Sequence, residues 1–301
     1  MSMGAKAAAT IPFRKIPFRY LGFGLLTVLG LRRRGFFIPH RYAESLPDAA
    51  PAPPYAPCEA LFDRHRADFA AVIAGMDAHA DALLAIGREP PPQPRWRQDW
   101  FPRLDGAAAY ALVRRHRPRR IVEIGCGHST RFLARAVRDG GIACTHTVID
   151  PQPRADIGNL PVTLTRALVQ RVDSAPFTAL EAGDMLFIDG SHILVPGSDA
   201  DWLFNRVLPA LRAGVLIHIH DILLPDPYPP AWRWRGYNEQ SAVAALLSGG
   251  AFTPLFASRY AATRMAAEVA GSVAGQLPLP GGAVESSLWL RKVSAPLGAL
   301  P

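Results

Sequence analysis

The sequence predicts an α/β fold built on a doubly wound, mostly parallel sheet. From residue 105 onward, short apolar runs alternate with longer amphipathic stretches, and several of the runs end in a glycine or an acid. The chain of 301 residues is 49% hydrophobic and 19% charged, which supports a large core and excludes wholesale disorder. Strands separated by helices join through right-handed crossovers, so helices should cover both faces of the sheet.

Positive charge is concentrated at the N-terminus. Residues 1–50 hold eight Lys or Arg and two Asp or Glu, so they contribute +6 of the net charge of +8. A nucleic-acid-binding domain more often carries its charge on the folded body, so we rank nucleic acid low as a partner. Three cysteines without metal spacing indicate a reducing, cytoplasmic compartment and no disulfide framework: Cys58, Cys126 and Cys144.

This basic segment contains an uncharged apolar stretch, residues 20–31, flanked by arginines on both sides. It is shorter than the roughly 20 residues of a membrane-spanning helix, and it lacks the cleavage site of a signal peptide. Two interpretations stay open. The stretch packs on the domain or a partner chain, or residues 11–41 make a peripheral membrane contact in which arginines face anionic headgroups. Residues 47–57 form a proline-rich linker that completes an N-terminal segment over 1–57.

Residues 58–104 are predicted to form a helical extension before the main domain. Apolar side chains recur every seven residues in its first part, at Phe62, Phe69, Met76 and Leu83. This spacing predicts one amphipathic helix over 58–86, ended by Gly87 and the prolines that follow. Such a helix packs on the domain or pairs with a second copy, so a homo-oligomer is one expected assembly.

The alternating pattern assigns the elements of the main domain, residues 105–301. Helices are predicted at 105–117, 129–141, 175–182, 198–214 and 237–250. Strands are predicted at 119–125, 143–150, 162–168, 184–190, 215–221, 251–257 and 284–293. In a sheet of this kind, ligands bind beyond the carboxyl ends of the strands, so the residues that follow the strands are the candidate functional residues.

The first strand leads into the sequence VEIGCGHST, residues 122–130. Gly125 and Gly127 allow a tight turn and close approach of a ligand to the backbone. Ser129 and Thr130 lie at the start of the next helix, where exposed N–H groups favour an anion or a carboxylate. The loop has no Lys followed by Ser or Thr, so it is not a phosphate-binding loop of the usual kind.

Two carboxylates accompany this turn. Glu123 precedes it, and a carboxylate there suits an ammonium group better than a pyrophosphate. Asp150 ends the next strand, a position from which it can reach the two hydroxyls of a ribose. The pattern therefore favours a ligand with both groups, and the alternative is an ordinary strand–helix turn beside a surface acid.

At these residues the chain resembles the class I S-adenosylmethionine-dependent methyltransferases. VEIGCGHST is similar to their first motif, and FIDGSH and HIHD resemble a bacterial subgroup with Asp-Gly-x-His and His-Asp strand ends. The resemblance covers roughly residues 105–292. It implies a Rossmann-like sheet of seven strands with the last strand antiparallel, and S-adenosylmethionine as cofactor. The predicted cofactor residues are Glu123, Gly125, Cys126, Gly127, His128, Ser129, Thr130, Asp150 and Asp189.

The fourth and fifth strands end in a second group of ionisable residues, which we predict to be catalytic: Asp189, His192, His220 and Asp221. Neighbouring strands would bring both acids to one edge. Two chemistries stay open there. A histidine accepts the proton of the acceptor, or Asp189 and Asp221 hold Mg²⁺ or another divalent cation. His218 lies deeper in its strand and is better explained as a core histidine.

Residues 223–240 form a long insertion after the fifth strand, which is typical of a functional lid. Its aromatic and basic residues suit a wall for the acceptor and an acidic group on it: Trp232, Arg233, Trp234, Arg235 and Tyr237. Residues 95–102 are expected to cover the cofactor from the other side. This composition favours a small-molecule or sugar-like acceptor.

The sequence as a whole therefore indicates a methyltransferase that uses S-adenosylmethionine, with oxygen as the expected methyl acceptor. Two rival interpretations remain. One is a metal-dependent hydroxylase or hydrolase on the same fold, with the cluster of Asp and His as its active site. The other is a non-catalytic scaffold that binds a membrane or a partner through its N-terminal third.

Overall fold

The computed structural model describes residues 18–46 and 52–300. The chain separates into two units, Met1–Ala50 and Pro51–Pro301. The described part of the first unit holds helix α1 (Phe18–Val28) and the short 3₁₀ helix η1 (Ala43–Ser45). Within the described residues, no helix is long and apolar enough to cross a membrane.

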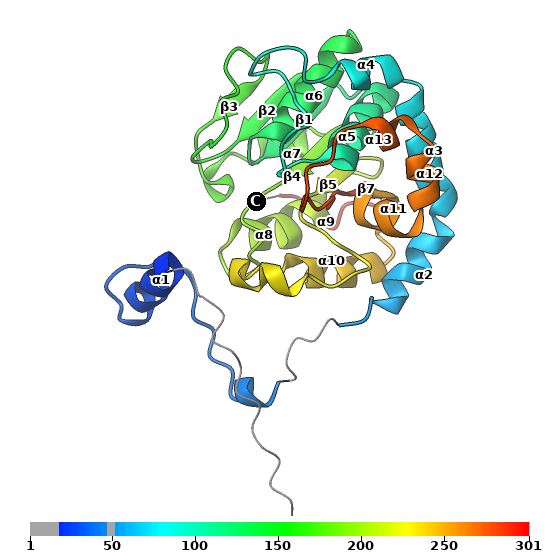
Figure 1. The fold of residues 1–301 in the computed structure, drawn as a ribbon. Helices are drawn as coiled ribbons and strands as arrows, with labels where there is room; N and C mark the ends of the chain where they lie inside the picture. The colour runs from blue at the N-terminus through cyan, green and yellow to red at the C-terminus, as the bar shows by residue number, and fades with distance from the viewer. Residues whose placement is uncertain (1–17, 47–51, 301) are drawn as a thin grey trace, which may run out of the picture. The chain divides into compact units, whose positions relative to one another are not determined.

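The second unit is built on one seven-stranded sheet, with strand order β3-β2-β1-β4-β5-β7-β6 (Figure 1). The strands are β1 (Arg120–Ile124), β2 (Thr145–Ile149), β3 (Thr163–Thr165), β4 (Met185–Ile188), β5 (Leu216–Ile219), β6 (Phe252–Ala257) and β7 (Leu288–Lys292). Only β7 is antiparallel to its neighbours β5 and β6; the pairings among β1 to β5 are all parallel. The predicted fold, a doubly wound sheet with an antiparallel last strand, is confirmed.

Helices connect the strands and form the flanking layers. They are α2 (Ala56–Arg64), α3 (Arg66–Asp77), α4 (Ala80–Ala85), α5 (Arg103–His116), α6 (His128–Asp139), α7 (Ala175–Thr178), α8 (Asp199–Trp202), α9 (Leu208–Ala210), α10 (Glu239–Ser248), α11 (Ser258–Arg264), α12 (Ala266–Ala270) and α13 (Val273–Gln276). Shorter turns are η2 (Val169–Arg171), the π-helical η3 (Leu203–Val207) and η4 (Pro230–Arg235). Helix α5 packs against both α6 and α3, so the helical extension lies directly on the domain.

The prediction of one helix over 58–86 is wrong, because three helices occupy this stretch. The chain leaves helical geometry at His65 (φ −103°, ψ 11°) and at His79 (φ −123°, ψ 23°). The seven-residue repeat itself has the predicted role, since its four side chains are buried at 0% exposure: Phe62, Phe69, Met76 and Leu83. The two breaks redirect short helices so that each repeat position reaches the core of its own chain.

The helix predicted at 198–214 also differs in detail. Ser198 caps it as expected, because its Oγ accepts a hydrogen bond of 3.0 Å from the backbone N–H of Asp201. Its middle widens into the π-helical turn η3 just before Pro209. Proline has no N–H to continue the α-helical pattern, which accounts for the local change. Helices α11 to α13, between β6 and β7, were not predicted.

One continuous apolar core holds the second unit together. It includes side chains from the extension, such as Phe62 and Trp96, together with the central strands. Part of the proline-rich linker is described, and the backbone N–H of Tyr55 donates to the carbonyl of Pro225. Residues 47–51 of the linker lie outside the described residues.

Candidate active site

The register of the parallel strands brings the predicted site residues to one edge. Ile124 of β1 pairs with Ile188 of β4, which pairs with Ile219 of β5. The residues that follow these three isoleucines are Gly125, Asp189 and His220, so they leave the sheet at the same level. The predicted adjacency of the fourth and fifth strands is therefore confirmed.

Gly125 joins the turn after β1 to the end of β4. Its φ is +83°, and a Cβ at this position would overlap the carbonyl oxygen of Asp189. Its own N–H donates to the carbonyl of Ile149 on the other side. Gly127, by contrast, has an extended φ of 176°, and no described atom lies within 4 Å of where its Cβ would be. The first glycine is required by packing, whereas the second borders open space.

Glu123 is completely buried behind this turn. Its Oε1 accepts hydrogen bonds from Ser129 Oγ at 2.6 Å and Thr130 Oγ1 at 3.0 Å. Its Oε2 accepts one from His146 Nε2 at 2.8 Å. Glu123 therefore ties β1, β2 and the start of α6 together, and it faces protein groups. Its predicted contact with an ammonium group stays a prediction.

Asp150 follows β2 and supports the same turn from the side. It accepts hydrogen bonds from the backbone N–H groups of Cys126 at 2.9 Å and Gln152 at 2.7 Å, one on each oxygen. A carboxylate oxygen has two lone pairs, so both oxygens of this half-buried residue can also accept from a ribose. Asp150 thus lies where the sequence predicts a ribose-binding acid.

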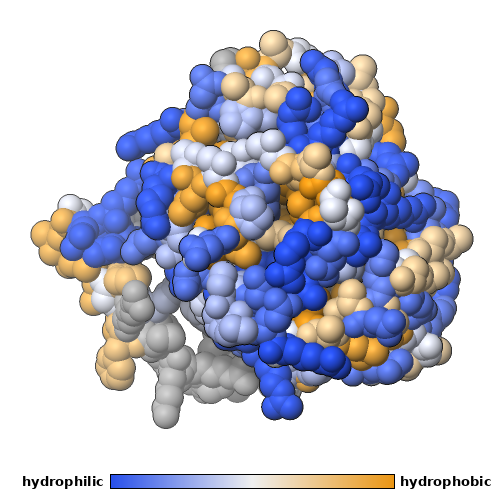
Figure 2. Space-filling view, turned by 90° about the horizontal axis from the view of Figure 1, so that it is seen from above, coloured by the Kyte–Doolittle hydropathy of each residue, from blue (hydrophilic) through white to orange (hydrophobic). Residues whose placement is uncertain are grey.

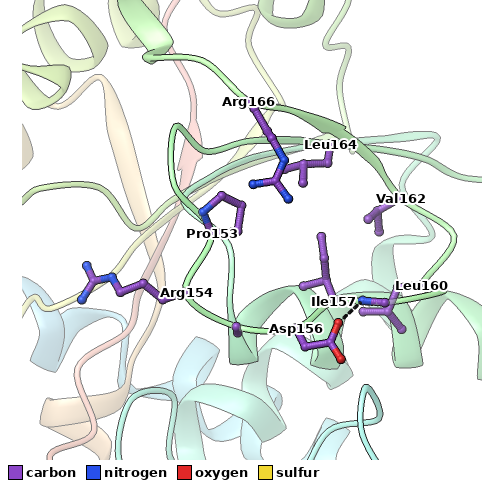
Figure 3. Close-up of a pocket in the computed structure, with 10 residues that line it drawn as sticks. Pro153, Arg154, Asp156, Ile157, Leu160, Val162, Leu164 and Arg166 are labelled. Atoms are coloured by element: carbon purple, nitrogen blue, oxygen red, sulfur yellow. Dashed lines mark hydrogen bonds between the residues drawn. The ribbon is translucent and has the colours of Figure 1, made fainter.

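A cavity of about 480 Å³ begins just beyond this acid. Its apolar lining comes from the loop before β3 and from β3 itself: Ile157, Leu160, Val162 and Leu164. Figure 3 shows Arg166 directed into the cavity near Pro153, while the side chain of Arg154 extends away from it. The cavity lies at the β2–β3 end of the sheet, away from the acids that follow β4 and β5.

At the other end of the site, His192 lies among three carboxylates. Its Nδ1 donates to Glu239 Oε1 at 2.5 Å. Its Nε2 lies 3.3 Å from Asp189 Oδ1 and 3.6 Å from Asp221 Oδ2. His192 is 5% exposed, whereas the side chain of Asp189 is 32% exposed, so the histidine is buried and the acid beside it is open to solvent. Two predicted acids and one predicted histidine are brought together, and Glu239 joins them from the start of α10.

The backbone at this edge is strained. His192 has φ 61° and Asp221 has φ 53°, and the described residues contain only one other non-glycine residue with a positive φ, Arg117. Such conformations cost roughly 1–3 kcal/mol each and tend to occur at functional sites. The strain is concentrated on two of the four predicted catalytic residues.

The chain resembles a methyltransferase of Podospora anserina bound to SAH (16% identity, 86% of this chain and all of that one, TM-score 0.40). It also resembles an O-methyltransferase of Bacillus cereus in complex with SAH (17% identity, 74% and 91%, TM-score 0.39) and a putative O-methyltransferase of Klebsiella pneumoniae (18% identity, 74% and 90%, TM-score 0.38). A search of curated protein sequences returned no match.

One family model matches part of the sheet. Residues 122–222 match the model described as a methyltransferase domain. The match covers about a third of the chain. The matched region begins in β1 and extends just past Asp221, so it contains both the glycine turn and the cluster around His192.

The electrostatics at this edge of the sheet favour a charged His192. Burial opposes its protonation, but Glu239, Asp189 and Asp221 outweigh burial and raise its pKa well above 6.5. Burial likewise opposes ionisation of Asp189, yet His220 and His192 outweigh it and lower the pKa of this carboxyl. At neutral pH the pair is therefore an imidazolium beside a carboxylate.

The two histidines of β5 and its end differ in role. His218 Nε2 bonds to Ser287 Oγ at 2.8 Å, and its ring stacks on Phe187 at 3.6 Å. Burial and the neighbouring His220 hold its pKa well below 6.5, as befits a neutral core histidine. His220 Nε2 donates to the carbonyl of Trp100 at 2.9 Å. This nitrogen is thus engaged with residues 95–102, the segment expected to cover the site.

Two residues of the glycine turn, Cys126 and His128, are uncharged at neutral pH. Burial, Asp150 and Glu123 raise the pKa of the Cys126 thiol to about 12, so it stays protonated. Burial and neighbouring arginines lower the pKa of His128 to about 4, so its ring is neutral. The ring of Trp100 meets His128 edge-on at 6.3 Å. Both residues can therefore shape the turn without contributing charge to it.

The insertion after β5 contacts the sheet edge that carries Asp189, His192 and Asp221, which we call the reaction edge. The contact is made by the cation Arg235. Arg235 lies 4.1 Å from the ring of Trp232 and 5.4 Å from that of Tyr237, and its Nη1 is 3.6 Å from Asp221 Oδ2. The ring of Tyr237 lies 4.5 Å from His192. Arg235 and Tyr237 thus border Asp221 and His192, and Trp232 packs on Arg235.

Two further contacts were not anticipated from the sequence. Ser286 Oγ donates to Asp221 Oδ1 at 3.1 Å, and Asp105 accepts from the backbone of Ser286 and Ser287. Burial raises the pKa of Asp105 to about 6. Neither Ser286 nor Glu239 belongs to a motif. The sequence offered only a weak signal for these two residues: each is polar and lies where a strand or helix begins, Ser286 before β7 and Glu239 at the start of α10.

Asp189 and Asp221 were the tentative metal ligands. Across residues 18–46 and 52–300, no three His, Cys, Asp or Glu side chains form a group suited to a metal ion. The ring of His192 is close to both carboxylates, and Arg235 is the second cation near Asp221. The protein's own cations thus balance these carboxylates, and the arrangement does not fit a dedicated metal site.

Proposed function

We propose that this methyltransferase domain transfers the methyl group of S-adenosylmethionine to an oxygen atom of a small-molecule or sugar-like acceptor. The observation that carries the proposal is the position of His192. Its Nε2 lies close to two carboxylates, and Glu239 holds its Nδ1. A histidine held in this way presents one nitrogen in a defined direction, which a general base requires.

The donor is assigned to the glycine turn and Asp150. Open space beside Gly127 lets a ligand approach the backbone, and Asp150 has lone pairs left for ribose hydroxyls. The cavity after Asp150, which has apolar side chains beside Arg166 and Asp156, is of a size that suits the base of a nucleoside. Because Gly125 packs on the backbone of Asp189, the donor turn and the reaction edge are held together.

Methyl transfer to a hydroxyl requires that the acceptor oxygen is aligned with the methyl group and that the hydroxyl loses its proton. S-Adenosylmethionine, when bound, supplies a methyl group activated by its sulfonium. The acceptor oxygen forms a bond to that carbon as the carbon–sulfur bond breaks, and the thioether product leaves. The hydroxyl proton passes to Nε2 of the neutral form of His192, which is the minor form at neutral pH, and Asp189, Asp221 and Glu239 stabilise the resulting imidazolium. His220 is assigned a positioning role, since its Nε2 already donates to Trp100.

The sequence left open whether Mg²⁺ or another divalent cation acts here. Two carboxylates are suitable donors for such an ion, but His192 and Arg235 already supply positive charge beside them. We therefore propose proton transfer at this edge and assign no step to a cation.

The acceptor is expected to enter beneath the insertion. Trp232 and Tyr237 offer apolar faces, and Arg235 offers a guanidinium beside Asp221. This combination suits an acceptor with a flat apolar part and an acidic group near its hydroxyl.

The proposal is tested first by calorimetry with S-adenosylmethionine and with its demethylated product. We expect both to bind the full chain and Asp150→Ala to weaken binding about tenfold or more, since a carboxylate bonded to two hydroxyls is lost. Asp68→Ala, an exposed acid on α3, is the matched control and should bind normally. Folded protein that gives no binding heat with either compound would overturn the proposal.

A further inference from the structure

The first unit exposes an apolar helix face. Five side chains of α1 and the residue after it lie within one sector of the helix and are 50–93% exposed: Phe18, Leu21, Leu25, Val28 and Leu29. Three more apolar residues on the following segment are 50–69% exposed: Phe36, Phe37 and Ile38. Exposed apolar surface of this extent usually marks an interaction site.

The other side of α1 is covered by the unit's own chain. Gly30 (φ +69°) reverses the backbone after the helix, and the N–H groups of Leu31 and Arg32 donate to the carbonyl of Leu26. The N–H of Arg34 donates to Thr27 Oγ1 at 2.9 Å, and its guanidinium lies 5.4 Å from the ring of Phe23. The return segment thus packs on one side of α1 and leaves the opposite side open.

The charged residues of the segment that follows this helix are all positive up to Arg41. Arg32, Arg33, Arg34 and Arg41 are exposed, and the first acidic residue of the whole chain is Glu44. In Figure 2, the first unit at the left of the view shows apolar and strongly hydrophilic residues side by side. Apolar side chains edged by arginines match the interface of a bilayer, where acyl chains lie just below phosphate groups.

We infer that residues 18–41 bind the surface of a membrane that contains anionic lipids. The helix has 11 residues, so at about 1.5 Å per residue it is far shorter than the roughly 30 Å of a bilayer core and would lie in the interface. Nucleic acid would match the arginines and leave the apolar face uncovered. A second copy would bring two purely basic segments together, which like charges oppose.

The test is sedimentation of the full chain with vesicles. One set contains phosphatidylcholine alone, and the other contains phosphatidylcholine with phosphatidylglycerol. We expect binding to the anionic vesicles that weakens as salt is raised. The double variant Leu25→Glu, Val28→Glu should bind about tenfold or more weakly, because it places charge on the face that enters the interface.

Matched controls come from the second unit. Leu168 and Leu279 are exposed there to 46% and 41%, and their replacement by Glu should leave vesicle binding unchanged. Unchanged thermal unfolding of the double variant shows that the second unit stays folded. The inference is wrong if the full chain does not bind anionic vesicles or if the double variant binds them as well as the parent. It is also wrong if light scattering shows a dimer that only the double variant loses, with no vesicle binding.

Discussion

The two ends of the site balance their buried charge in different ways. At the donor end, Glu123 accepts bonds from two hydroxyls and one histidine at 2.6–3.0 Å, and all of them are bonds within the fold. At the reaction edge, His192 has one short bond to Glu239 and two longer contacts, at 3.3 and 3.6 Å, to Asp189 and Asp221. Both oxygens of Glu123 have partners within the fold. The groups around His192, by contrast, are strained and rich in charge.

This difference separates two kinds of residue. Groups at the donor end hold three secondary-structure elements in place, so their removal should act on folding. Groups at the reaction edge have a shifted pKa and positive φ values, which cost stability and are kept where chemistry needs them. Substitutions on the two sides should therefore separate stability from turnover.

The largest effect is expected for Gly125→Ala. The new Cβ would overlap the carbonyl oxygen of Asp189 at a φ of +83°, so we expect a loss of about 3–5 kcal/mol in the free energy of unfolding. Urea denaturation measures it. Gly127→Ala is the matched control and should cost less than about 1 kcal/mol, because its Cβ points into open space. Equal losses for the two variants would contradict the assignment.

The next effect is expected for His192→Asn. The amide can still donate to Glu239, while the nitrogen that faces Asp189 and Asp221 is removed. Turnover should fall about 10²–10⁴-fold. The unfolding midpoint should change little above the raised pKa of His192, where the ring is neutral, and should fall below it, where the charged ring contributes stability. The control is His65→Asn, which alters a surface histidine paired with Asp68 and should leave turnover unchanged. A variant that keeps full turnover would exclude His192 as the base.

A smaller effect on turnover and on stability is expected when the pH is changed. The carboxylates around His192 raise its pKa well above 6.5, and only the neutral ring accepts a proton, so turnover should rise with pH through that raised value. The stability that the charged ring contributes is complete below pH 6.5 and is lost over the same rise. Glu239→Gln removes one carboxylate and should move both transitions to lower pH. Profiles of turnover and of unfolding midpoint that stay in place would contradict this role of Glu239.

The smallest effect is expected from chelation. Because His192 and Arg235 supply positive charge beside Asp221, treatment with EDTA should leave turnover unchanged. Assays before and after dialysis against the chelator measure it. Loss of turnover that Mg²⁺ restores would show that a cation acts at this edge and would replace the proton-transfer proposal.

Much of the fold follows from local sequence. Apolar runs that end in Gly or Asp predict the strands and their carboxyl edge, and the seven-residue repeat from Phe62 to Leu83 predicts which side chains are buried. These patterns are readable because burial and the periods of helix and strand act over a few residues. The same patterns miss the breaks at His65 and His79, which depend on the surface that the helices cover.

The roles of individual site residues depend on tertiary structure. Gly125 and Gly127 look equivalent in the sequence, yet only Gly125 packs against another strand. The sequence predicts that Glu123 binds a ligand. In the fold, its carboxylate accepts hydrogen bonds from Ser129, Thr130 and His146. Glu239 lies 47 residues from His192 and bonds to it directly. The sequence by itself determined the sheet and the edge where the candidate site residues lie. Only the packed structure decided which groups face one another there, because contacts between distant segments leave no local pattern.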